Sequence, residues 1–124
     1  MRSILRVALS ISATLALAAC SGGGAATTGP VASVCNDSTG ATTVDAHVKN
    51  KVWSQPVSAK VGDVITWTND DAVAHKVALD DGSCTMGANI APNGGAASLV
   101  FTKAGTYPFH CAIHPSMTGT ITIS

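Results

Sequence analysis

A cysteine, a histidine and a methionine lie within seven residues near the end of the chain: Cys111, His114 and Met117. A thiolate, two imidazoles and a weak thioether form the ligand set of blue-copper electron-transfer sites, because soft sulfur suits Cu(I) and imidazole suits Cu(II). The spacing fits one tight loop between two strands, and Pro115 would stiffen it directly after the histidine. The pattern predicts a site for one copper ion and requires a second histidine from elsewhere in the chain.

Three further histidines, His47, His75 and His110, are candidates for that position. His110 adjoins Cys111, so the alternation of side chains along a strand should point it to the opposite face. His47 lies in an early alternating segment and is expected to face solvent. His75 follows a break in the chain at 69–71 and precedes an apolar segment, which makes it the best candidate.

The elements that must position these residues read as short strands separated by turns. Apolar alternation or β-branched runs occur at 44–48, 64–68, 73–79, 98–101, 106–111 and 118–123. Charged residues make up only 11% of the chain, Glu is absent, and Gly, Asn and Asp mark the breaks, so no convincing helix is predicted. We expect an all-β fold, a Greek-key β-sandwich or barrel of about seven to eight strands, over residues 44–124. Pro108 inside a strand predicts an edge or a bulge.

The N-terminal twenty residues have the pattern of an export signal. Arg2 and Arg6 precede an apolar stretch that ends in small residues before Cys20. This pattern predicts a signal peptide over 1–19. Cys20 after Leu-Ala-Ala resembles a bacterial lipobox, in which it would be acylated; the alternative is an ordinary signal with Cys20 left free or removed. Residues 20–43 would then be a Gly/Thr-rich tether and lead-in to the folded domain. The protein would be a membrane-anchored lipoprotein that faces the periplasm or the cell exterior.

Two cysteines remain, Cys35 and Cys84, both close to turns. In an exported protein a disulfide between them is the simplest interpretation, and two free thiols are the alternative.

Charge excludes one class of partner. The full chain has a formal net charge of zero, and without residues 1–19 it keeps five lysines and seven aspartates, 5 − 7 = −2. The sequence has no basic stripe of the kind that would indicate nucleic-acid binding.

We expect the protein to be a monomer.

Residues 44–124 resemble the small blue-copper proteins, the plastocyanin/amicyanin group of cupredoxins. The segment 61–69 is similar to the family's GD-x-V-x-W-x-N motif, 104–111 to its AGTY-x-(F/Y)-(H/Y)-C strand, and C-x-x-H-P-x-M to the short, amicyanin-like ligand loop. The resemblance implies a Greek-key β-sandwich, one copper ion that cycles between Cu(I) and Cu(II), and electron shuttling. Carried over by position, the ligands are His75, Cys111, His114 and Met117.

Two departures from the family pattern stand out. Where the family usually has Pro-His-Asn, this chain has Ala74-His75-Lys76. A lysine side chain cannot accept a hydrogen bond, so the side-chain tie that the family's Asn makes between the ligand loops is expected to be missing. The Cys35/Cys84 pair is not a general family feature, and one hypothesis is that it replaces this restraint.

An electron carrier, and not an enzyme, is the expected function, because an axial Met leaves no open position on copper. In the family His114 would be the electron's exit, and Ile113, Pro115 and Pro92 could form an apolar docking patch for transient redox partners. One alternative is copper capture or delivery at the cell surface without a fast redox role. Another is a structural zinc site in an interaction domain.

Overall fold

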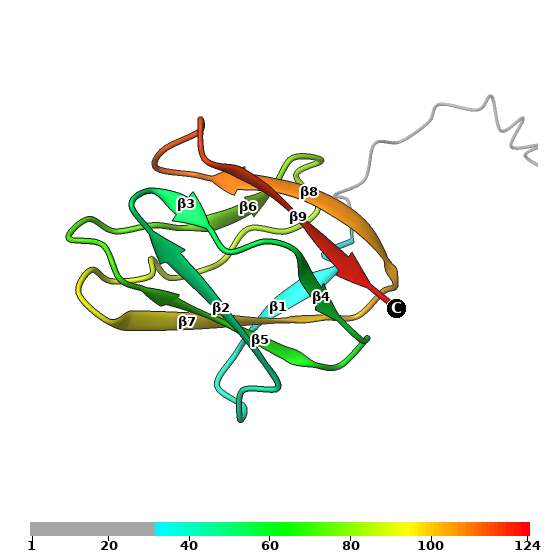
Figure 1. Cartoon of the computed structure of the whole chain (residues 1–124). Coiled ribbons are helices and arrows are strands. Elements are labelled where there is room, and N and C mark those ends of the chain that lie inside the picture. Colours follow the sequence, from blue (N-terminus) through cyan, green and yellow to red (C-terminus); the bar gives the residue numbers. More distant parts are fainter. Residues whose placement is uncertain (1–31) are drawn as a thin grey trace, which may run out of the picture.

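The computed structural model describes residues 32–124, which form nine β-strands and no helix (Figure 1). The strands are β1 (Cys35–Ser38), β2 (Val44–Lys49), β3 (Val52–Trp53), β4 (Val57–Ala59), β5 (Val64–Asn69), β6 (Val77–Leu79), β7 (Gly95–Phe101), β8 (Gly105–Cys111) and β9 (Thr118–Ile123). No helix in this part of the chain is therefore long and apolar enough to cross a membrane.

The strands form two sheets, in the orders β1-β7-β5-β2-β3 and β4-β9-β8-β6. The pairs β2–β5 and β4–β9 are parallel, and every other strand pair is antiparallel. The sheets face each other across one core, which confirms the predicted all-β sandwich (Figure 1). The strand count exceeds the expected seven to eight because β1, β3 and β4 have only four, two and three residues, too few to show a clear alternation.

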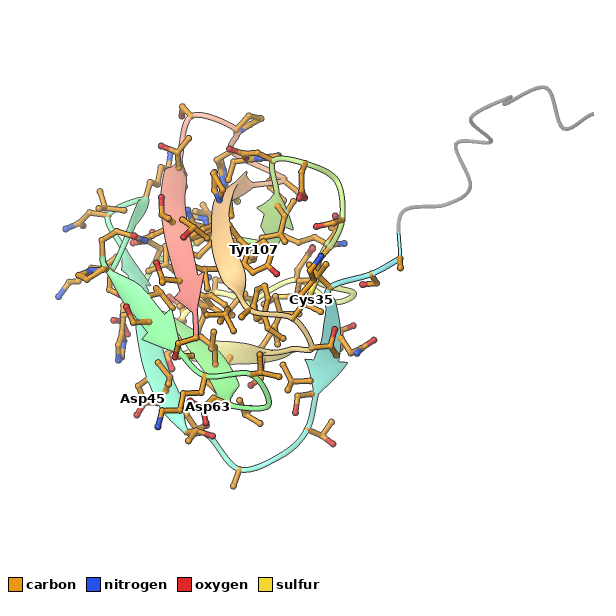
Figure 2. The ribbon with its side chains drawn as sticks, turned by 90° about the vertical axis from the view of Figure 1, so that its right-hand side faces the viewer. Cys35, Asp45, Asp63 and Tyr107 are labelled. Carbon is orange, nitrogen blue, oxygen red and sulfur yellow. A yellow bond between two sulfur atoms is a disulfide. The ribbon has the colours of Figure 1, made fainter. Side chains whose placement is uncertain are left out.

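Side chains from both sheets fill the space between them. Trp67, Phe101 and Phe109 are the largest fully buried side chains. Along β8, Tyr107, Phe109 and Cys111 are buried while the residues between them are more exposed, as strand alternation predicts. In Figure 2 the labelled Tyr107 lies inside the sandwich and Asp45 and Asp63 lie at its outside.

The folded sheet begins at Cys35, inside the segment 20–43 that the sequence suggested as tether and lead-in. β1 pairs with β7 from Cys35↔Phe101 to Ser38↔Ser98. A disulfide joins Cys35 to Cys84, with their Cα atoms 5.7 Å apart, and both residues are buried. The carboxylate of Asp37 also accepts the backbone N–H of Gly87 at 2.9 Å. The predicted signal peptide 1–19 and Cys20 lie outside the described residues.

Pro108 was predicted to lie on an edge strand or at a bulge, and both expectations were wrong, because β8 is an inner strand and its register with β9 is unbroken from Gly105 to His110. β8 lies between β9 and β6. β6 ends at Leu79, opposite Phe109, and the next residue, Asp80, donates its N–H to the carbonyl of Pro108 at 2.9 Å. Asp80 and Pro108 are thus opposite each other, and the return hydrogen bond of this pair is missing because proline has no N–H. The proline removes one hydrogen bond, directly after the last residue of β6.

The site and the start of the described chain lie at opposite ends of the sandwich. Cys35 pairs with Phe101, the last residue of β7. At the other end of β7, the loop before Gly95 lies beside His75, because His75 and Ile90 exchange backbone hydrogen bonds. The β8–β9 loop is at this same end (Figure 1). One end of the fold thus carries the ligand loops and the other receives the N-terminal segment.

Candidate metal centre

Three predicted ligands converge at one end of the sandwich. The metal-binding atoms of His75, Cys111 and His114 all lie within 4.8 Å of one another. The Sγ atom of Cys111 is 3.7 Å from Nδ1 of His75 and 3.8 Å from Nδ1 of His114. With bonds of about 2.0 Å to nitrogen and 2.3 Å to sulfur, the lengths found in zinc sites, two donors of one ion lie about 3.5–3.7 Å apart. The spacing therefore allows one metal ion to contact all three side chains.

Strand pairing places the buried histidine against the cysteine. Cys111, the last residue of β8, pairs with Val77, the first residue of β6, and His75 lies two residues earlier. β6 is shorter than the predicted 73–79, because the chain before it pairs elsewhere: His75 N donates to Ile90 O at 3.1 Å and Ile90 N donates to His75 O at 2.7 Å. This bridge fixes the backbone of His75. The His75 side chain is fully buried.

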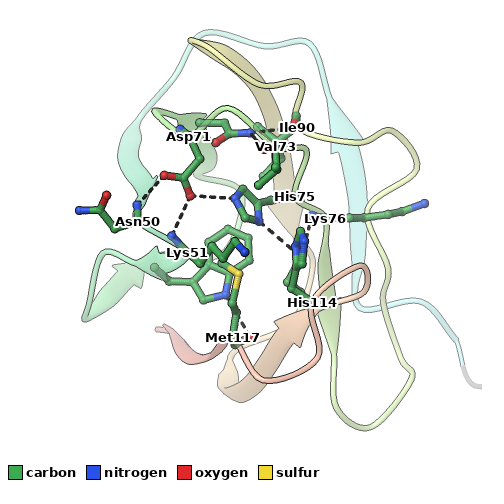
Figure 3. A network of polar contacts seen from close by, with 12 residues as sticks. Asn50, Lys51, Asp71, Val73, His75, Lys76, Ile90, His114 and Met117 are labelled. Atoms are coloured by element: carbon green, nitrogen blue, oxygen red, sulfur yellow. Dashed lines mark hydrogen bonds and ion pairs between the residues drawn. The ribbon is translucent and has the colours of Figure 1, made fainter.

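The loop that follows Cys111 closes on itself. Met117 N donates to His114 O at 2.9 Å, which makes a turn with Pro115 at its second position, where the fixed φ of proline is favoured. Cys111 N donates to Met117 O at 2.9 Å. Half-buried His114 and buried Met117 are thereby held at the same end of the fold as His75 (Figure 3).

A carboxylate orients the ring of His75. Its Nε2 is 2.9 Å from Oδ2 of Asp71, four residues earlier (Figure 3). Because an ionised carboxylate can only accept, Nε2 carries the proton and Nδ1 presents its lone pair to the Cys111 side. Such a partner on the outer ring nitrogen is the usual way in which a protein fixes a ligating histidine.

Asp71 is itself held by the turn between β2 and β3. Asn50 and Lys51 form this two-residue hairpin turn with φ values of 55° and 58°, and both backbone N–H groups donate to the Asp71 carboxylate, Lys51 at 2.8 Å. The Lys51 N–H, aided by that of Asn50 and by His75, holds the pKa of Asp71 below its usual 3.8 despite partial desolvation. The β2–β3 hairpin therefore supports the site from outside.

The backbone of Lys76 makes the connection between the ligand loops that its side chain was expected to lack. Lys76 N donates to Sγ of Cys111 at 3.4 Å, and Lys76 O accepts Ala112 N at 2.8 Å. Its Nζ donates instead to Gly87 O at 3.2 Å. Because the ties to the Cys111 loop are main-chain hydrogen bonds, they are available to any residue except proline.

The remaining histidines lie apart from the cluster. His47 Nδ1 pairs with Asp70 at 3.1 Å and His110 Nδ1 with Asp80 at 2.6 Å, both at the surface. The residues that sequence reasoning missed are Asp71 and Trp53. Asp71 lies four residues before His75, and this spacing was an available signal. Trp53 donates its indole N–H to Met117 O, and nothing near Trp53 in the sequence indicated this contact.

A two-sheet β-sandwich with a His-Cys-His cluster at one end defines a cupredoxin-type copper protein, and comparison with known proteins agrees. The profile of the family described as "Copper binding proteins, plastocyanin/azurin family" matches residues 42–124. Amicyanin of Paracoccus denitrificans is 39% identical over 87 residues, 68% of this chain and 66% of that protein. Amicyanin-alpha of Methylorubrum extorquens is 32% identical over 112 residues, 87% of this chain and 92% of that protein.

Solved structures give the same answer. The reduced Cu(I) form of an amicyanin variant superposes with a TM-score of 0.62 at 27% identity, covering 73% of this chain and 99% of that one. The oxidized state of another amicyanin variant gives a TM-score of 0.63 at 28% identity, with coverage of 73% and 99%. The chain belongs to the plastocyanin/azurin family of copper-binding proteins. It is therefore a copper-binding electron carrier and not an enzyme.

Proposed function

We propose that the protein is a type 1 (blue) copper protein that shuttles single electrons between redox partners, with His75, Cys111, His114 and Met117 as the copper ligands. The observation that carries this proposal is the spacing of the two Nδ1 atoms, 3.7 and 3.8 Å from the Cys111 sulfur. Copper bound there supplies the one-electron couple.

The surrounding residues suit electron transfer because they resist movement. The His75 ring is held on one side by Asp71 and its backbone is paired with Ile90. The Cys111 thiolate is buried and accepts the N–H of Lys76, which stabilises its negative charge. A site that keeps one geometry in both oxidation states needs little rearrangement when an electron enters or leaves.

The surface near His114 suits brief contacts with a partner. Ile113 is 44% exposed, Pro115 and Pro92 are exposed, and Val73, two residues before His75, is 39% exposed. We propose that Ile113, Pro115 and Pro92 contribute to an apolar docking patch around His114, the electron's exit. A small patch of this kind favours weak and transient binding.

Electron self-exchange tests the shuttling role against copper delivery, which would use the same ligands. We expect fast exchange between the Cu(I) and Cu(II) proteins and slow loss of copper to a chelator, because the ligand frame is rigid. Stopped-flow or NMR line-broadening measures the exchange, and chelator competition measures the loss. Slow exchange combined with rapid loss of copper would instead establish the delivery function.

We also propose that residues 1–19 are a signal peptide, that Cys20 is acylated, and that the part of the segment 20–43 before Cys35 is a tether to the folded domain. Export is supported by the sequence pattern of 1–20 and by the Cys35–Cys84 disulfide, a bond typical of oxidising compartments. The protein would then face the periplasm or the cell exterior from a membrane, as a monomer. The mass of the mature protein from the membrane fraction should equal residues 20–124 plus lipid; an unmodified N-terminus would refute the anchor.

A further inference from the structure

Trp53 ends the β2–β3 hairpin with its side chain in the core and its indole N–H aimed at the ligand loop. The residue is 3% exposed, and its Nε1 donates to the carbonyl oxygen of Met117 at 3.2 Å. The same oxygen accepts the backbone N–H of Cys111 at 2.9 Å. The carbonyl that closes the Cys111–Met117 loop thus receives two hydrogen bonds, one from within the loop and one from a residue 64 positions earlier.

The ring of Trp53 also contacts two other parts of the site. It lies edge-on to His75, with ring centroids 5.8 Å apart and planes at 65°. Its centroid is 5.3 Å from that of Phe109, which shares the buried face of β8 with Cys111. One side chain therefore touches the buried histidine, the strand that carries the cysteine and the backbone of the methionine.

Trp67 shows that this arrangement is not a general property of buried tryptophans in this core. Trp67 is fully buried and also contacts Phe109, with centroids 6.4 Å apart. Its Nε1 has no hydrogen-bond partner within residues 32–124. The two tryptophans thus share a neighbour and an apolar environment, and differ in whether the indole N–H holds the ligand loop.

We propose that Trp53 is a positioning residue for the copper site, which fixes the closing end of the ligand loop through Met117 O and the ring of His75 through edge contact. The inference rests on the ligand set proposed above. With the Trp53 N–H removed, the Met117 carbonyl keeps only the hydrogen bond from Cys111 N, so the thioether is held less firmly. A weaker axial sulfur stabilises Cu(II) less, which raises the reduction potential.

The test compares Trp53→Phe with Trp67→Phe, since each removes one indole N–H from the same core. In Trp53→Phe we expect a higher reduction potential than in the wild type. In the metal-free protein we expect alkylation of the buried Cys111 thiol to be about fivefold faster, the factor that loss of one ordinary hydrogen bond gives. Trp67→Phe should keep the wild-type potential and alkylation rate, after correction for each variant's free energy of unfolding.

Equal potentials and equal corrected alkylation rates in the two variants would overturn the proposal. If Trp53→Phe does not fold, NMR of the wild-type protein tests the proposal instead, through the chemical shifts of the two indole N–H signals. The Trp53 signal should shift more than that of Trp67 between the metal-free and Cu(I) forms, and equal shifts would overturn the proposal. Failure of the copper function itself appears separately, as a wild-type protein without a blue Cu(II) spectrum.

Discussion

Replacing Cys111 by serine abolishes the intense blue absorption of the Cu(II) protein while the β-sandwich remains folded. The colour of such a site comes from the copper–thiolate bond, and a serine hydroxyl is neither soft nor ionised at neutral pH. The fold survives because serine is close to cysteine in size and its hydroxyl can still accept the N–H of Lys76. Visible absorption during Cu(II) titration measures the first effect, and circular dichroism the second.

His110→Ala is the matched control. His110 is the neighbour of Cys111 in sequence, but it pairs with Asp80 at the surface and lies outside the ligand cluster. This variant should keep the full blue band. A blue band that persists in Cys111→Ser would disprove thiolate ligation, and a wild-type protein that stays colourless with Cu(II) but binds Zn²⁺ tightly would establish the zinc alternative.

Removal of the Cys35–Cys84 disulfide, by replacing both residues with alanine, is expected to cost about 4 kcal/mol of unfolding free energy. The bond spans 49 positions, and in the chain-entropy model a closed loop of about fifty residues contributes about 4 kcal/mol. For a domain of this size that loss lowers Tm by roughly 20 °C. Denaturant unfolding of the metal-free protein measures it, and a change below about 1 kcal/mol would contradict the model.

The copper spectrum of the same double variant separates stability from site geometry. The disulfide joins β1 to the segment after β6, whereas the ligand loops are tied through the backbone of Lys76. We therefore expect an unchanged blue band in the folded variant. A shifted band would support the other hypothesis, that the disulfide replaces the restraint normally made by the family's Asn.

The features that the sequence predicted are those set by local patterns. Cys111, His114 and Met117 are close together in the chain, so their spacing alone indicated a loop. The alternation of side chains along β8 correctly placed His110 on the opposite face of the strand from Cys111. β1 and β3 could not be predicted, because four and two residues carry almost no periodicity and depend on their partner strands. β1, for example, exists through its pairing with β7, more than sixty residues later.

The support around the ligands was missed for a related reason. Asp71 reaches the N–H groups of Asn50 and Lys51 only because the β2–β3 hairpin folds back beside it, and Trp53 meets Met117 across 64 residues of chain. Neither contact corresponds to a recognisable pattern in the sequence, because the residues involved are far apart in the chain. What the sequence did contain was a histidine in a family motif; how that histidine is oriented depends on tertiary structure.

The position of Cys35 at the far end of β7 also decides how an anchored molecule would face its surroundings. Seven residues of strand, about 20 Å, separate the pairing of Cys35 with Phe101 from the end of β7 that adjoins His75. A support joined directly to the first described residues, just before Cys35, would therefore lie on the side away from His114. A domain fixed to an electrode by a short link at that point would present its His114 end outward, where a diffusing partner can reach it without meeting the support.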